Sequence, residues 1–153
     1  MIYTAAKMLH IIGFATAFGI SLATFFAYNQ FWRLYEINRE QGLAAFKAFT
    51  FLQRVGASGL MLVLLAGITM LALSKWSFAS LLWFQIKLGL IALIFVNGFT
   101  LGRTSTIKLD HFINQGVHEG DDTLKLQANL RRFLLIQILL YVTIIFLSVF
   151  RFV

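Results

Sequence analysis

Four long stretches of the sequence are uncharged, except for a single lysine, and basic residues bound each of them. The stretches have 25, 20, 27 and 18 residues and occupy positions 8–32, 55–74, 76–102 and 133–150. A helix needs about 20 apolar residues to cross a bilayer, and a lipid-exposed strand or loop cannot satisfy its backbone hydrogen bonds there. The sequence therefore predicts an all-α fold, namely an integral membrane four-helix bundle.

The composition supports this class. Of the 153 residues, 59% are hydrophobic and only 12% are charged, whereas soluble domains average about 25% charged residues. The chain has no proline, so no helix carries a proline kink. It also has no cysteine, which excludes disulfides, iron–sulfur clusters and thiol catalysis.

Lysine and arginine are divided unequally between the two sides of the predicted membrane. Nine of the 13 lie in the two long connections, about residues 30–54 and 102–132. The positive-inside rule places these connections in the cytoplasm and both termini outside, in a bacterial-type inner (plasma) membrane. The same rule explains the net charge of +7, so no nucleic-acid partner is expected. The predicted single domain, residues 1–153, spans the membrane at about residues 4–29, 55–73, 77–101 and 133–150.

The first long connection has a helical composition. Apolar residues on either side of Gly42 predict that the first two helices extend into the cytoplasm and that Gly42 breaks them. The connection between the second and third helices, around Ser74 to Ser77, is short, so these two helices should be antiparallel neighbours.

Lys87 is the charged residue inside the third apolar stretch. If the helix continues from Lys75, Lys87 lies roughly 18 Å along it, near the middle of a ~30 Å hydrocarbon core. A cation there costs about 2.5 to 3.5 kcal/mol on insertion scales. Lys87 therefore needs a partner, loss of its proton, or access to water. Snorkelling to the surface is the simpler alternative, but its reach of about 6 Å makes this strained from the midplane.

His10 lies on a stripe of small and polar residues in the first helix. The stripe follows helical spacing and consists of Ala6, His10, Gly13, Ala17, Ser21 and Thr24. Such stripes mark close helix contact or room for a ligand, so His10 should face the bundle. It is either a structural histidine bonded to a neighbouring helix or a ligand of haem or another metal. It should lie one to two turns below the outer surface, with Lys87 about two turns deeper.

Three further polar residues fall at the cytoplasmic half of the predicted bundle. Arg54 opens the second helix and could hold a propionate, phosphate or carboxylate, although such arginines are more often interface anchors. Asn97 and Gln137 should lie at similar depth on the third and fourth helices and could hydrogen-bond to each other. Joining of helices is the favoured interpretation for this pair.

Three segments of the sequence resemble the HemJ-type protoporphyrinogen oxidases, a family of small four-helix membrane proteins. The segments are KMLHII at 7–12, QRVGASGLMLVLLAGI at 53–68 and LWFQIKLGLIALI at 82–94. The chain departs from the family at Asn97, where the family has a histidine, and in lacking a proline in the second helix.

The resemblance implies a b-type haem bound within the bundle. It implies His10 as the axial ligand, and therefore as the metal-binding residue, and Lys87 as an essential group, here the candidate catalytic residue. Arg54 would hold a propionate beside Lys87 and His10. The implied activity is the oxidation of protoporphyrinogen IX in porphyrin biosynthesis, with a porphyrin-type small molecule as substrate.

The leading functional prediction is therefore a haem-b-binding membrane oxidoreductase. Two alternatives stay open: a non-catalytic membrane subunit or scaffold whose polar residues only join helices, and a small transporter with Lys87 lining an anion path. The Gly98–Gly102 GxxxG pattern and aromatic outer surfaces permit a homo-oligomer or a larger membrane complex.

Overall fold

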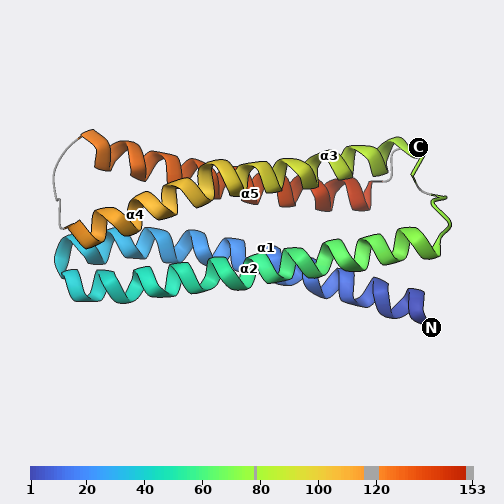
Figure 1. Ribbon diagram of the computed structural model, residues 1–153, viewed down its shortest axis with the longest axis horizontal. Helices are drawn as coiled ribbons and strands as arrows, with labels where there is room; N and C mark the ends of the chain where they lie inside the picture. Colours follow the sequence, from blue (N-terminus) through green and yellow to red (C-terminus); the bar gives the residue numbers. More distant parts are fainter. Residues whose placement is uncertain (78, 116–120, 151–153) are drawn as a thin grey trace. The chain divides into compact units, whose positions relative to one another are not determined.

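The computed structural model describes residues 1–77, 79–115 and 121–150. These residues form helices joined by turns and contain no strand. The helices are α1 (Ile2–Ile37), α2 (Arg39–Leu73), α3 (Leu82–Asn97), the π-helical segment η1 (Gly98–Arg103), α4 (Thr104–Gln115) and α5 (Asp121–Val149) (Figure 1). Four stretches are long and apolar enough to cross a membrane: Ile2–Ile37, Arg39–Leu73, Leu82–Ile113 and Thr123–Val149. The predicted all-α membrane class is confirmed for this part of the chain.

The chain divides into two compact units, Met1–Phe84 and Gln85–Val153. The first unit contains the antiparallel helices α1 and α2 (Figure 1). In the second unit, η1 and α4 continue from α3, and both of them contact α5. Each unit is therefore a helical hairpin.

A single residue, Asn38, joins α1 to α2. Its extended backbone ends α1, while its side-chain oxygen accepts hydrogen bonds from the backbone N–H groups of Glu40 at 2.9 Å and Gln41 at 3.3 Å. This is an N-cap, which satisfies donors that a helix start would otherwise leave without partners. The predicted break at Gly42 is wrong, because the break lies four residues earlier and Gly42 is inside α2.

Gly42 instead lets the two helices pack closely near the turn, because it has no side chain. A Cβ atom at this position would lie 2.7 Å from the backbone and side chain of Tyr35 on α1. Any larger residue would therefore push α1 and α2 apart just after they turn.

Helices α1 and α2 are longer than a bilayer is thick. With 36 and 35 residues, they extend for roughly 54 and 52 Å, against a hydrocarbon core of ~30 Å. The part near Asn38 has an aromatic core, with ring centroids 5.8 Å apart for Phe31 and Phe46 and 6.1 Å apart for Tyr28 and Phe49. The predicted extension of both helices beyond the membrane-spanning length is confirmed, and these rings hold the extension together.

In the apolar half of this hairpin, the helices approach through residues with little or no side chain. A Cβ on Gly13 would lie 3.1 Å from the carbonyl oxygen of Gly59, and a Cβ on Gly59 would lie 3.1 Å from the backbone nitrogen of Ala17. The small stripe on α1 therefore makes close helix contact, as small residues do in membranes.

In the second unit, the π-helical segment η1 realigns the face that α3 and α4 present to α5. The buried residues Ile94 and Asn97 end α3, and the buried positions Gly102, Ser105 and Leu109 follow. The step from 97 to 102 is five residues, which brings two residues onto one face only where the helix is wound with i to i+5 bonds. If the same residues were wound as an α-helix, Asn97 and Gly102 would face in different directions.

Candidate functional site

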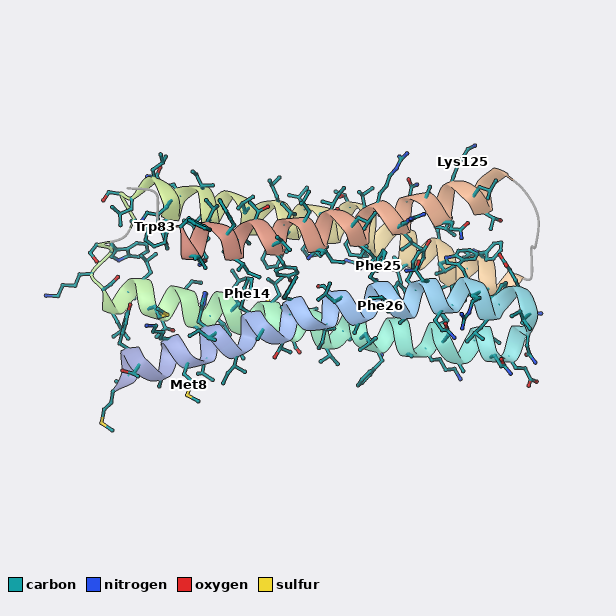
Figure 2. All side chains as sticks on the ribbon, turned by 180° about the vertical axis from the view of Figure 1, so that it is seen from behind. Met8, Phe14, Phe25, Phe26, Trp83 and Lys125 are labelled. Carbon is teal, nitrogen blue, oxygen red and sulfur yellow. The ribbon has the colours of Figure 1, made fainter. Side chains whose placement is uncertain are left out.

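His10 faces α2 and is hydrogen-bonded to its backbone. The Nδ1 atom of the imidazole lies 2.9 Å from the carbonyl oxygen of Val63. Because a carbonyl oxygen only accepts, Nδ1 carries the hydrogen in this contact. Met8, two residues earlier, points away from the hairpin (Figure 2) and is 64% exposed. The predicted inward orientation of His10 is confirmed within this hairpin.

Gly67 provides the space in which the imidazole lies. A Cβ atom at Gly67 would be 3.3 Å from Cε1 and 3.4 Å from Nδ1 of His10. Val63 and Gly67 are one turn apart on α2, so the carbonyl of one and the missing side chain of the other together seat the ring.

This contact fixes the tautomer of the neutral imidazole. When Nδ1 donates its hydrogen to a carbonyl, Nε2 carries the lone pair of the neutral ring. Histidine ligands of metals are commonly oriented in this manner, by a hydrogen bond from the other ring nitrogen to a backbone carbonyl. The same bond also joins two helices, so the geometry suits both interpretations that the sequence left open. Among the described residues, no three His, Cys, Asp or Glu side chains gather as a metal site, and His10 stands as a single-ligand candidate.

Lys87 lies closer to the end of its helix than the sequence suggested. Helix α3 begins at Leu82 rather than shortly after Lys75, because the chain turns through positive φ angles at Lys75 and Trp76. Lys87 is therefore only about 7.5 Å along the helix from its first residue. By the same measure, His10 lies about 12 Å from the first residue of α1. The two distances are measured along different helices, so the predicted difference in membrane depth between His10 and Lys87 stays a prediction. A lysine this close to the end of its helix can snorkel with little strain.

The partner of Lys87 is a neutral hydroxyl group. Lys87 Nζ donates to Ser148 Oγ at 3.0 Å, and Ser148 Oγ donates to the carbonyl oxygen of Ile144 at 2.7 Å. Ser148 is the last residue but one of α5, so both ends of this bond lie near the ends of their helices. The sequence analysis did not pair Ser148 with Lys87.

Arg54 is exposed and lies within the continuous helix α2. It precedes Val63 by nine residues, which is roughly 13.5 Å along the helix. The residues that seat His10 therefore do not include Arg54, and its role toward a propionate stays a prediction. His10 and Arg54 belong to the first unit and Lys87 to the second, so the structure does not gather the three into one described site.

Asn97 and Gln137 form the hydrogen bond that the sequence predicts. Asn97 Nδ2 donates to Gln137 Oε1 at 2.9 Å and to the carbonyl oxygen of Phe133 at 3.1 Å. Both side chains are buried, with 7% and 9% of their surface exposed. This pair joins α3 to α5 immediately before η1 begins.

Sequence reasoning missed the two residues that seat His10. Val63 acts through its backbone carbonyl, which leaves no signal in the residue type. Gly67 could have been found, because it falls on the α2 face that also carries Gly59 and Val63, at spacings of four residues.

Comparisons of the chain with family models, with curated proteins and with solved structures give no match. The resemblance to the HemJ-type oxidases therefore stays a prediction, and the candidate site rests on the contacts of its own residues.

Proposed function

We propose that this chain is a haem-b-binding membrane oxidoreductase in which Nε2 of His10 ligates the iron. The observation that carries the proposal is the 2.9 Å hydrogen bond from His10 Nδ1 to the Val63 carbonyl. It supports the proposal because it orients the ring and leaves Nε2 with the lone pair, as in other histidine ligands of metals. The open space at Gly67 fits this role, since a side chain there would displace the ring.

The haem would supply one-electron chemistry, while the chain supplies binding and orientation. Val63 and Gly67 hold the ligand, and the apolar faces of α1 and α2 exclude water from it. Oxidation of protoporphyrinogen IX is the finer form of the proposal, with Arg54 toward a propionate and Lys87 as the candidate catalytic group. An inner-membrane location with both termini outside belongs to the same proposal and is supported by the distribution of Lys and Arg.

The absorption spectrum of the detergent-purified protein tests the proposal. The protein should be expressed with ample haem and measured oxidised and after dithionite reduction. Wild type should show a Soret band and sharp reduced α and β bands, and His10→Ala should lose them. His111→Ala is the matched control, because it removes an exposed histidine from α4 and should leave the spectrum unchanged. A colourless wild-type protein would overturn the proposal.

A second candidate is a non-catalytic membrane subunit. It is favoured by the bonds from Lys87 to Ser148 and from Asn97 to Gln137, which join helices and need no ligand. A colourless protein that keeps its cellular function after His10→Ala and Lys87→Ala would support this candidate over the first.

A further inference from the structure

The amide pair of Asn97 and Gln137 has donors and an acceptor that its own contacts do not use. Both hydrogens of Asn97 Nδ2 are taken, one by Phe133 and one by Gln137 Oε1. The two hydrogens of Gln137 Nε2 and the Oδ1 atom of Asn97 have no partner among the residues that the structure describes. The two side chains as a whole are more than nine-tenths buried. Gln137 Nε2 and Asn97 Oδ1 are not among the fully buried polar atoms without a partner in the part of the chain that the structure describes, so the small exposed surface of the pair includes these atoms.

The pair lies well inside the candidate spans. Asn97 is fifteen residues from Leu82, or about 22 Å along the helix, and Gln137 is twelve residues from Val149, or about 18 Å. At such positions an amide group without a partner is costly, because lipid offers no hydrogen bonds. A partner for these groups must therefore come from outside the described hairpin.

The chemistry of the pair defines what that partner can be. Two N–H donors and one carbonyl acceptor stand beside each other, and neither side chain is charged. Asn97 and Gln137 are five or more residues from the nearest charged residues, Arg103 and Arg132. A carboxylate or phosphate is poorly matched to a neutral site, whereas a neutral carbonyl group on a lipid-soluble ring fits it.

We propose that Asn97 and Gln137 bind the head group of a membrane quinone. Gln137 Nε2 donates to a quinone carbonyl oxygen, and Asn97 Oδ1 accepts from the hydroxyl group of the reduced quinol. The π-helical segment η1 begins at the next residue, Gly98, and such segments frequently occur at functional sites. A Cβ on Gly98 would meet no atom within 4 Å, so the helix is open beside the pair.

Quinone binding gives the proposed oxidoreductase an electron acceptor. A quinone takes two electrons and two protons to become a quinol, and both would come from the substrate that is oxidised. This redox role rests on the proposed function, whereas binding of the quinone does not.

Infrared spectroscopy of the protein in phosphatidylcholine nanodiscs tests the binding. The probe is decylubiquinone labelled with ¹³C at its carbonyl carbons, so that its carbonyl stretch is distinguished from lipid esters and amides. Wild type should bind it saturably and shift the carbonyl band to lower frequency. The absence of saturable binding, or of a band shift, would overturn the proposal.

Gln137→Met removes the donors at nearly constant volume and should weaken binding at least about tenfold. Gln137→Glu keeps an acceptor for Asn97 and, when protonated, one donor, so it should weaken binding less. Gln127→Met is the matched control on the same helix and should bind as wild type does. Equal affinity of Gln137→Met and wild type would show that the pair only joins helices.

Failure of this inference is separable from failure of the proposed function. His10→Ala should lose the haem spectrum and still bind the quinone with unchanged affinity. A haem-containing wild type that binds no quinone would sink the quinone site alone. A colourless wild type that binds quinone would sink the haem proposal alone.

Discussion

In the first unit, α1 and α2 meet through their backbones, whereas in the second unit α3 and α5 meet through polar side chains. Gly13, Ala17 and Gly59 let the first pair of helices approach so closely that a Cβ added at either glycine would lie 3.1 Å from the backbone of the other helix. The second pair is joined by Asn97 with Gln137 and by Lys87 with Ser148. Both are known means of helix association in lipid, where the hydrophobic effect does not drive helices together.

The two means make the units sensitive to different changes. Close backbone contact tolerates loss of polar atoms but not added volume, while a polar pair tolerates added volume nearby but not loss of a partner. His10 is an exception in the apolar half of the first unit, because its side chain hydrogen-bonds to the backbone carbonyl of Val63. This exception is what makes it the stronger site candidate.

The largest effect is expected from adding volume to the first unit. Gly59→Leu should destabilise the protein by about 3 kcal/mol, because its Cβ alone would lie 3.1 Å from the Ala17 backbone nitrogen and the helices must separate. The measurement is the free energy of unfolding in mixed micelles.

The control for this change is Gly19→Leu on α1. A Cβ at Gly19 meets no atom within 4 Å, so the same substitution should change stability by less than about 0.5 kcal/mol. Equal losses at both glycines would mean that the backbone contact does not hold the hairpin together.

A smaller effect is expected from removing the amide partner in the second unit. Asn97→Leu loses both of its hydrogen bonds and should cost about 1 to 2 kcal/mol. A double-mutant cycle with Gln137→Leu measures the coupling of the two side chains. Asn129→Leu, at an exposed position of α5, serves as the control, and a coupling energy near zero would contradict the assigned bond.

The sequence carries the parts of this structure that depend on residue type over long stretches. The four apolar runs, the inward face of His10 and the Asn97–Gln137 pair follow from charge, spacing and depth alone. The position of Lys87 along its helix does not, because it depends on where α3 begins. Two non-glycine residues with positive φ, Lys75 and Trp76, delay that start, and neither is typical of such a turn. The seat of His10 was missed because a backbone carbonyl forms half of it.

The π-helical segment offers a test of register in the second unit. Deleting Phe99 should convert η1 to an α-helix and leave Asn97 and Gly102 four residues apart, still facing α5. We expect a stability change of at most about 1 kcal/mol, measured by unfolding in micelles. Val96 is also exposed but lies within α3. Its deletion would leave Ile94 and Asn97 two residues apart, so that they would no longer share a face of the helix. The Val96 deletion should therefore lose at least about 2 kcal/mol, and similar losses for both deletions would refute the realignment.

The smallest effect is expected at Lys87. It tests whether the Lys87–Ser148 pair lies nearer the membrane surface than the Asn97–Gln137 pair. A lysine at the middle of a span raises the apparent insertion free energy by about 2.5 to 3.5 kcal/mol. From its place five residues after Leu82, Lys87 can direct its amine to the surface, so Lys87→Leu should lower that energy by less than about 1 kcal/mol. Glycosylation-based insertion of the 76–103 segment measures this, with Ala92→Lys as the comparison for a central lysine. If Lys87→Leu lowered the apparent insertion free energy by as much as Ala92→Lys raised it, Lys87 would lie deep in the membrane. Its bond to Ser148 would then have to compensate a much larger cost of insertion.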